Sequence, residues 1–298
     1  MGDLILASEA LAAGAVTRND LRRRYVKLHR NVYIRSGREL TALDRAKAAW
    51  LWSNREAVLV GNSAAALLGT KWLPADAPAE LGRVRYPAPP GIVVHSGVIA
   101  GDEICTVAQI ACTTPARTAY DLGRRQLPLE RAVIGIDALL NATRAPVSAV
   151  DAMALRYPGA RGIRNVREAL GLVDGGAESP QETRLRLLLV QSGIPRPVTQ
   201  IPVRDDRGRV VRRIDMGWPE WMVGAEYDGE QHFTDPDAYA ADIERLELLA
   251  GRGWTIVRVS SRQLRWQRPE VVARVRRALA AAGMPFRANR VNLRSLGD

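Results

Sequence analysis

The sequence has few of the residues that build disulfide frameworks, zinc sites or membrane spans. Its 298 residues include two cysteines, Cys105 and Cys112, and three histidines, with no C-x-x-C pair. This argues against a structural zinc site and a disulfide scaffold. The longest apolar runs, such as Leu187–Val190, are far shorter than the roughly 20 residues of a membrane-spanning helix. The first residues lack the basic segment of a signal peptide, so we expect a cytoplasmic protein with reduced thiols and no membrane partner.

Lysine is also scarce, and arginine carries almost all of the positive charge. Lys27, Lys47 and Lys71 are the only lysines beside 40 arginines, and the formal net charge is +11. A GC-rich genome would explain the choice of arginine over lysine better than it explains the sign of the net charge. A basic excess of this size favours polyanionic partners such as nucleic acids.

Composition divides the chain into four segments. A Gly-rich stretch at 174–180 ends in a helix start and predicts a linker between two folded parts. The predicted segments are a short basic region (1–38), a mostly helical region with a strand-rich insert (39–175), an alternating helix and strand region (179–283) and a tail (284–298).

The first segment reads as two helices and a strand-rich wing. Leu4–Ala13 is the first predicted helix, and Thr17 with Asp20 forms a capping box for the second. Tyr25–Ile34 alternates as a strand or small wing does. The alternatives are a small packing module and a phosphate-binding module, the latter using the arginines of the second helix: Arg22, Arg23 and Arg24.

Two strings in these first segments resemble AbiEi-type antitoxins. One is the T-R-x-x-L helix followed by the strand Arg30-Asn31-Val32-Tyr33, and the other is T-T-P-A-R-T-A-x-D-L at 113–122. The resemblance implies a winged-helix-like start, but no recognition helix fits between Arg24 and the wing. Of the middle segment we predict helices and the strands 84–86, 92–95 and 104–110, with His95 and Arg117 structural.

The third segment opens with a helix that carries an acid on its inner face. Ser179-Pro180-Gln181-Glu182 forms a capping box, which by itself accounts for Glu182. The spacing of the later leucines nonetheless places Glu182 on the stripe that packs inward. Arg184 and Arg186 fall off that stripe, so we predict that both lie on the solvated face.

Three extended stretches follow, and acids gather at their ends. A turn joins Val198–Val203 to its hairpin partner Arg209–Met216, and Trp221–Asp228 is a third, apolar strand. If the last two strands pair, Asp215 and Glu226 come close in space. Glu226 and Asp228, two positions apart, project from one face.

Carboxylates that cluster at a buried strand end repel one another unless a cation or protons neutralise them. Hard oxygen ligands of this kind suit Mg²⁺ or Mn²⁺, which can activate water and hold a phosphate oxygen. The hairpin that leads to the acids is rich in arginines that could contact neighbouring phosphates: Arg204, Arg207, Arg209, Arg212 and Arg213.

The order of these motifs resembles the PD-(D/E)xK nuclease superfamily, specifically a domain related to the very-short-patch repair endonuclease. The matching strings are E-Y-D-G-E-Q-H at 226–232, D-I-E-R-L-E-L-L at 242–249 and G-W-T-I-V-R at 253–258. The resemblance implies that Asp215 and Glu226 hold the metal and that Glu182 is the first-helix acid that binds the metal or its water.

Asp228 departs from the superfamily pattern, which has lysine at that position. Asp228 would then be a third ligand or a turn former before Gly229. His232 or Gln231 would supply the missing donor or base, unless His232 is only a turn residue. Arg245 is either a helix ion-pair partner or a phosphate contact.

The sequence therefore predicts an α/β (α+β) protein. The C-terminal part would be a restriction-endonuclease-like mixed sheet flanked by helices, after a mostly helical, winged-helix-like N-terminal region. The expected function is Mg²⁺- or Mn²⁺-dependent hydrolysis of DNA in repair or defence. The alternative is a catalytically weak nuclease fold that binds DNA as a regulator or antitoxin. RNA is an alternative substrate, and a second copy of the chain and a toxin or repair protein are candidate partners.

Overall fold

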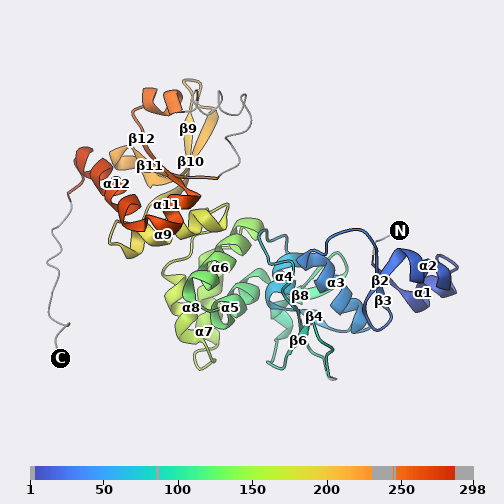
Figure 1. Ribbon diagram of the computed structural model, residues 1–298. Coiled ribbons are helices and arrows are strands. Elements are labelled where there is room, and N and C mark those ends of the chain that lie inside the picture. Colours follow the sequence, from blue (N-terminus) through green and yellow to red (C-terminus); the bar gives the residue numbers. More distant parts are fainter. Residues whose placement is uncertain (1–3, 85–86, 230–243, 245, 286–298) are drawn as a thin grey trace, which may run out of the picture. The chain divides into compact units, whose positions relative to one another are not determined.

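The structure, a computed structural model, describes residues 4–84, 87–229, 244 and 246–285 (Figure 1). The chain divides into two compact units, residues 1–180 and 181–298. The predicted linker at 174–180 lies at this division. No helix within the described residues is long and apolar enough to cross a membrane.

The N-terminal unit begins with a small antiparallel sheet. Thr17 caps the second helix as predicted, since its hydroxyl accepts from the Asp20 N–H at 3.0 Å and Asp20 Oδ2 accepts from the Thr17 N–H at 3.0 Å. A strand follows that helix directly, so there is no recognition helix at this point. The elements are β1 (Leu4–Leu6), α1 (Ala7–Ala12), α2 (Arg18–Arg24), β2 (Tyr25–His29) and β3 (Val32–Arg35), with strand order β1-β3-β2.

The prediction of one helix over Leu4–Ala13 is wrong. Residues 4–6 form a strand because Leu4 pairs with Ile34 and Leu6 with Val32, near the other end of this module. Leu6 and Val32 share a buried apolar cluster. A contact with a strand about thirty residues away therefore overrides the local helical pattern.

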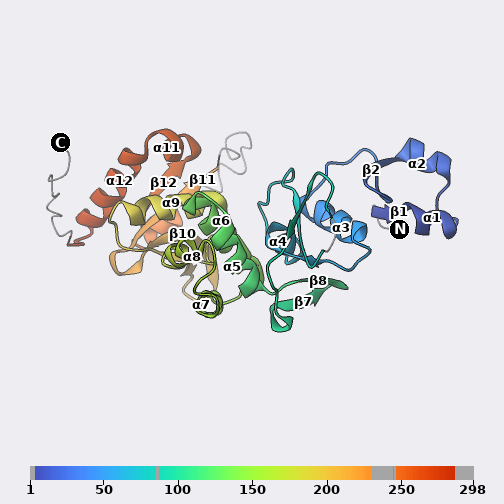
Figure 2. The same ribbon diagram turned by 90° about the horizontal axis from the view of Figure 1, so that it is seen from below.

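A five-stranded mixed sheet follows, with order β6-β5-β4-β8-β7. Figure 2 labels two of its strands, β7 and β8. Of the predicted strand 84–86, Val84 follows the strand Ala79–Gly82 and belongs to no strand, and residues 85 and 86 lie outside the described residues. The prediction of one continuous strand over 104–110 is wrong. The stretch 104–110 turns at Ala108 and Gln109, which both have positive φ, as a two-residue hairpin requires. The elements are α3 (Ala42–Trp52), β4 (Val58–Leu59), α4 (Gly61–Leu67), β5 (Ala79–Gly82), β6 (Ile92–His95), a 3₁₀ turn (Gly101–Glu103), β7 (Ile104–Val107) and β8 (Ile110–Thr113).

The unit ends in a group of helices around α5, which packs against α6, α7 and α8 and also against α4. Thr114 caps α5 through an Arg117 N–H to Oγ1 bond of 3.3 Å, with Pro115 at the first helical position. The buried side chains of this group include Tyr120, Ile136 and Val166. The helices are α5 (Pro115–Arg125), α6 (Leu129–Thr143), α7 (Val147–Arg156) and α8 (Ile163–Leu170).

The C-terminal unit contains a four-stranded sheet with order β12-β11-β10-β9. Its strands β9 and β10 form the predicted hairpin, and β11 pairs antiparallel with β10 and parallel with β12. The sheet is therefore mixed, and the α/β fold class is confirmed. The elements are α9 (Pro180–Gln191), β9 (Val198–Arg204), β10 (Val210–Trp218), a 3₁₀ turn (Pro219–Trp221), β11 (Val223–Asp228), β12 (Thr255–Ser260), α11 (Ser261–Trp266) and α12 (Arg268–Ala281). Residues 246–251 are also helical.

The main core of this unit lies where α9, α11 and α12 cover the sheet (Figure 1). Leu185 and Leu189 of α9 pack there with Ala225 of β11 and Val257 of β12. Residues alternate along a strand, so Gly224 and Glu226 lie on the other face of β11. Strand β11 has a neighbour on both sides, as expected for a central, buried strand.

Candidate functional site

Two of the predicted acids meet between β10 and β11. The antiparallel ladder pairs Met216 with Ala225. The next positions along the two strands, Asp215 and Glu226, therefore lie opposite each other. Asp215 Oδ2 accepts a hydrogen bond of 2.9 Å from the Tyr227 N–H. The Asp215 side chain is thus held against the backbone of β11, next to Glu226.

Glu226 is almost completely withdrawn from solvent, with 3% of its surface exposed. A carboxylate in such a place is costly unless hydrogen bonds or positive charge compensate it. The residues of β11 that precede Glu226 are apolar, and the strand lies inside the sheet. A buried acid on a central strand is therefore a feature that packing alone does not explain.

The third acid approaches from α9. Glu182 is buried and its Oε2 lies 3.4 Å from the Nε2 of Gln200 on β9. Gln200 occupies the position opposite Asp215, between the paired residues Ile201 and Thr199. A chain of neighbours thus runs from Glu182 through Gln200 and Asp215 to Glu226. We call Glu182, Asp215, Glu226 and Asp228 the acidic site.

Asp228 has a cationic partner, Arg258, for which the sequence predicts no role. Arg258 Nη2 lies 2.6 Å from Asp228 Oδ2, and both side chains are largely shielded from solvent. Arg258 is on β12, where it is the register partner of Glu226. Arg258 belongs to the G-W-T-I-V-R string, but the sequence alone does not show that the strand of this string, β12, lies next to β11.

The prediction that Arg186 lies on a solvated face is wrong. Its side chain is 1% exposed and ranks among the largest fully buried side chains of the described residues. Arg186 follows Glu182 by four positions, which places both on one face of α9. Arg184 is partly exposed. The four-residue spacing from Glu182 indicates that Arg186 faces inward. Arginine side chains are usually exposed, however, which favours the opposite prediction.

The donor set of the acidic site fits a hard divalent cation, because carboxylate oxygens from neighbouring elements are the ligands that Mg²⁺ and Mn²⁺ prefer. As arranged here, the described residues contain no ready group of three or more His, Cys, Asp or Glu side chains around one metal position. The segment 230–243, which continues from β11 and includes His232, lies outside the described residues. So does Arg245.

The arginine-rich hairpin ends at the acidic site, since Asp215 lies on β10. All five hairpin arginines are exposed. Two of them are engaged within the turn: Arg204 Nη1 donates to Gly208 O at 2.8 Å, and Arg209 Nη2 contacts Asp205 Oδ2 at 2.8 Å. Hydrogen bonds from the Arg209 backbone and side chain hold the pKa of Asp205 below its usual value. The turn is thus locally braced, and Arg207, Arg212 and Arg213 extend its basic surface.

The arginines of α2 are exposed, and they occupy the last turn of that helix. Their basic surface is partly compensated, because Arg24 Nε lies 3.6 Å from Asp20 Oδ1.

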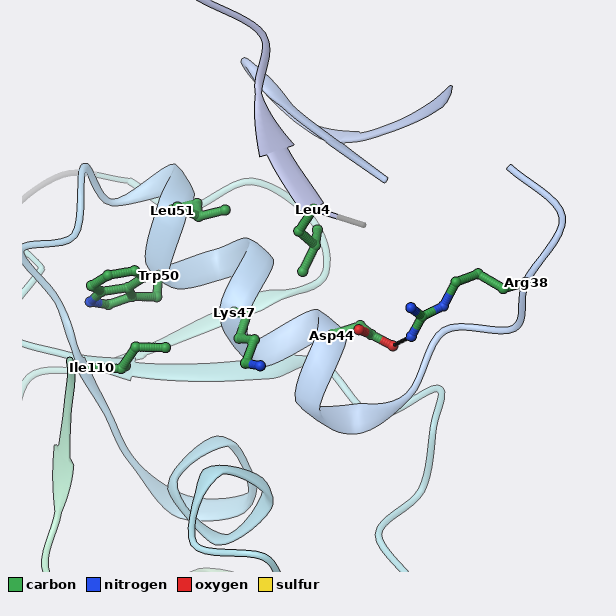
Figure 3. A pocket seen from close by; sticks show the side chains of 7 residues that line it. All are labelled: Leu4, Arg38, Asp44, Lys47, Trp50, Leu51 and Ile110. Atoms are coloured by element: carbon green, nitrogen blue, oxygen red, sulfur yellow. Dashed lines mark hydrogen bonds and ion pairs between the residues drawn. The ribbon is translucent and has the colours of Figure 1, made fainter. Parts of the chain in front are cut away.

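A cavity of about 320 Å³ lies elsewhere in this unit, lined by Leu4, Lys47, Trp50 and others (Figure 3). Its Arg38 is paired with Asp44. The lining combines apolar side chains with the Arg38–Asp44 ion pair. These lining residues form no cluster of acids or bases that could serve catalysis.

The N-terminal unit also buries charge, in a cluster around Arg117. Arg117 Nε lies 3.1 Å from Asp121 Oδ2, and Nη1 contacts Glu103 Oε2. Burial lowers the pKa of Arg117, but Asp121 and Glu103 more than offset this and raise it overall. Arg124 and Arg125 also contact Asp121, at 2.9 and 3.2 Å. Arg117 is therefore a core ion-pair partner, as predicted.

His95 is likewise engaged in a local network. Its Nε2 lies 2.7 Å from Glu80 Oε2, and Glu80 Oε1 accepts from the Asn62 N–H at 2.9 Å. These contacts join β6, β5 and α4. They fit the predicted structural role of His95.

No family model matches the sequence. Two curated relatives are uncharacterized proteins of Mycobacterium tuberculosis, MT2308 of strain CDC 1551 / Oshkosh and Rv2248 of strain H37Rv. Each is 33% identical to the chain over 201 residues, which are 67% of the chain and 73% of the relative.

Proposed function

The chain belongs to the same protein family as these two mycobacterial proteins, and from its own acidic site we propose that it is a divalent-metal-dependent DNA endonuclease. The observation that carries the proposal is that Asp215 and Glu226 lie one position beyond the Met216–Ala225 pair on adjacent strands, with the Asp215 carboxylate held on the Tyr227 N–H. Buried acids at one strand junction serve metal-assisted phosphodiester hydrolysis better than they serve stability.

In this proposal Asp215 and Glu226 hold Mg²⁺ or Mn²⁺, and Glu182 binds the same ion or orients its water. The ion, when bound, polarises the scissile phosphate and makes water a better nucleophile. Gln200 keeps the Glu182 carboxylate turned toward β9 through their 3.4 Å contact. The backbone N–H of Tyr227 keeps Asp215 in the same way. Both contacts fix the ligands before substrate arrives.

In this proposal Arg258 supplies the positive charge that lysine supplies in the superfamily pattern. Asp228 replaces that lysine in sequence, and its 2.6 Å pair with Arg258 brings a permanent cation beside the strand of Glu226. A guanidinium does not give up a proton near neutral pH, so Arg258 serves to stabilise negative charge on the phosphate and not to act as a base. His232 is the proposed proton carrier.

The exposed hairpin arginines bind phosphates that flank the cleaved bond. Such contacts position the backbone without reading its sequence. The net charge of +11 favours the encounter with DNA over the whole molecule. Repair or defence is the biological setting that this activity would serve.

The test is nicking of supercoiled plasmid with Mg²⁺ or Mn²⁺ by wild type and Asp215→Asn. Asparagine keeps an oxygen that can accept from the Tyr227 N–H, so the substitution removes charge with little loss of structure. We expect a loss of roughly 100-fold or more, since the variant forfeits several kcal/mol of charge stabilisation. Asp206→Asn is the matched control, because Asp206 is 93% exposed in the hairpin turn.

Equal cleavage by wild type and Asp215→Asn would contradict the proposal and indicate a contaminating nuclease. Cleavage by neither, together with tight DNA binding in a gel-shift assay, would favour the second candidate, a DNA-binding regulator with a nuclease fold. The occupation of the lysine position by Asp228 is the observation that favours this candidate.

A further inference from the structure

The two cysteines of the chain face each other across the hairpin of β7 and β8. Cys105 on β7 is the register partner of Cys112 on β8. Their sulfur atoms lie 3.6 Å apart, and both residues are free thiols in this structure. Directly opposed residues of an antiparallel ladder have Cα atoms about 4.5–5.5 Å apart. Disulfides join Cα atoms that are about 4.4–6.8 Å apart, so the ladder already provides the backbone geometry for a bond between the two sulfurs.

The hairpin holds the two thiols in this register from both of its ends. At the tip, Ala108 and Gln109 both have positive φ, which closes a two-residue turn. At the base, the Thr114 N–H donates to Glu103 O at 2.9 Å. The Glu103 side chain is in turn paired with Arg117 of α5. Because both ends are fixed, the strands do not slide past each other and the sulfur atoms stay opposite.

Solvent reaches one of these residues and not the other. Cys105 is partly exposed, and in the described part of the chain β7 is an edge strand of its sheet. Cys112 is fully buried on β8, which has β7 on one side and β4 on the other. Burial raises the pKa of Cys112 to about 12, so its thiol stays protonated near neutral pH. A small oxidant therefore meets Cys105 first, with Cys112 as the second thiol directly beside it.

We propose that Cys105 and Cys112 form a redox pair, which hydrogen peroxide converts to an intramolecular disulfide and a thiol reductant restores. In the first step the Cys105 sulfur attacks the peroxide, the O–O bond breaks, and a sulfenic acid and water form. In the second step the Cys112 sulfur attacks the Cys105 sulfur and the S–O bond breaks. The hydroxyl leaves with the Cys112 proton as a second water. Two electrons and two protons thus pass from the two thiols to the peroxide.

The proximity of the thiols favours the disulfide over further oxidation of Cys105. With the sulfur atoms 3.6 Å apart the second step is intramolecular, and well-oriented groups react as though present at about 10⁵ M or more. The bond cross-links β7 to β8 and restricts mainly the unfolded chain, so it stabilises the N-terminal unit. The redox pair belongs to this unit alone, and its chemistry depends neither on the acidic site nor on the proposed nuclease function.

The test treats the full chain with hydrogen peroxide near neutral pH, removes the peroxide with catalase, unfolds the protein in iodoacetamide and measures its intact mass. We expect oxidised wild type to be two hydrogen atoms lighter than the reduced chain and to take up no alkyl group. The same sample reduced with dithiothreitol before unfolding should take up two alkyl groups. A non-reducing gel should show a single chain, because Cys112 is shielded from other molecules.

The matched variants are Cys112→Ala and Cys105→Ala, which each remove one thiol and keep a small apolar side chain. Dimedone, which captures sulfenic acids, should label Cys112→Ala at least about 10-fold more than wild type, because no second thiol competes for the sulfenic acid. Cys105→Ala should not be labelled, since its remaining thiol is buried. Oxidised wild type should also melt a few degrees above reduced wild type, a difference that Cys112→Ala should not show.

Three results would overturn the redox pair. The first is alkylation of both thiols in wild type that has been treated with peroxide and not reduced. The second is equal dimedone labelling of wild type and Cys112→Ala, which would mean that Cys112 does not react with the sulfenic acid. The third is a disulfide that joins two chains instead of β7 and β8. The first and third are read on wild type, so they do not depend on whether a variant folds.

Discussion

Both units of the molecule bury carboxylates, but they surround them differently. In the N-terminal unit, Asp121 is contacted by three arginines, and Glu103 by Arg117 and by the hydroxyl of Tyr157. In the C-terminal unit, the contacts of Asp215 and Glu182 include a backbone N–H and a side-chain amide. The arginines around Asp121 all belong to its own helix α5, whereas the acids of the C-terminal unit come from α9, β10 and β11 and approach one strand junction. The first cluster is therefore suited to stabilising a helix within the core, and we propose that the second holds a divalent cation.

The largest expected effect comes from breaking the Arg117 cluster. Arg117→Leu removes a buried cation and leaves Glu103 and Asp121 in the core, each at most 1% exposed. Loss of one partner of a buried ion pair costs about 3–5 kcal/mol. We expect urea denaturation to show a free energy of unfolding lower by about that amount, with hydrogen exchange accelerated in α5 and not in β11.

The control for this variant is Arg24→Leu. Its ion pair with Asp20 spans 3.6 Å, and the arginine is 71% exposed, so water already screens the charges. Denaturation of Arg24→Leu should match that of the wild type. A similar loss of unfolding free energy in both variants would show that burial does not determine how much the Arg117 cluster stabilises the unit.

The next largest effect is expected from removing the cation beside the acidic site. Arg258→Met removes the cation paired with Asp228, and we expect cleavage to fall roughly 10- to 100-fold. Arg258→Lys keeps the charge but loses the planar guanidinium, so its loss should be smaller. Plasmid nicking measures both. An Arg258→Met enzyme that cleaves as fast as wild type would remove Arg258 from the catalytic scheme.

The smallest effect concerns the two free thiols of the N-terminal unit. Cys105 and Cys112 face each other across β7 and β8, with their sulfur atoms 3.6 Å apart. Burial, with the neighbouring Cys105, raises the pKa of Cys112 to about 12. Iodoacetamide at pH 8 should therefore modify partly exposed Cys105 and spare Cys112, as mass spectrometry would reveal. Equal labelling would show that this part of the unit opens far more often than its packing implies.

Local chemistry made much of the fold predictable. The capping residues Thr17 and Thr114 act within one helical turn, so the residues that predict each helix start are close together in the sequence. The hairpin of β9 and β10 follows from chain order and a short turn. The approach of Asp215 to Glu226 follows in the same way from the short connection between β10 and β11. The strand at Leu4–Leu6 was not predictable in this way, because its partner is β3.

The site was less predictable than the fold for the same reason. Glu182, Asp215 and Glu226 stood out because acids interrupt apolar patterns. Arg186 and Arg258 did not, since arginine is usually exposed and only the packing of α9 and β12 reveals their burial. Gln200 was missed because it has a positive φ of 51° in the middle of β9, a backbone state that the residue type does not signal.

The most direct test of the acidic site is titration of the full chain with Mn²⁺, followed by the electron paramagnetic resonance signal of the free ion. Wild type and Asp206→Asn should both bind Mn²⁺ in the same stoichiometry, whereas Asp215→Asn and Glu226→Gln should lose that binding. Equal Mn²⁺ binding by all four proteins would contradict the claim that these acids share one ion.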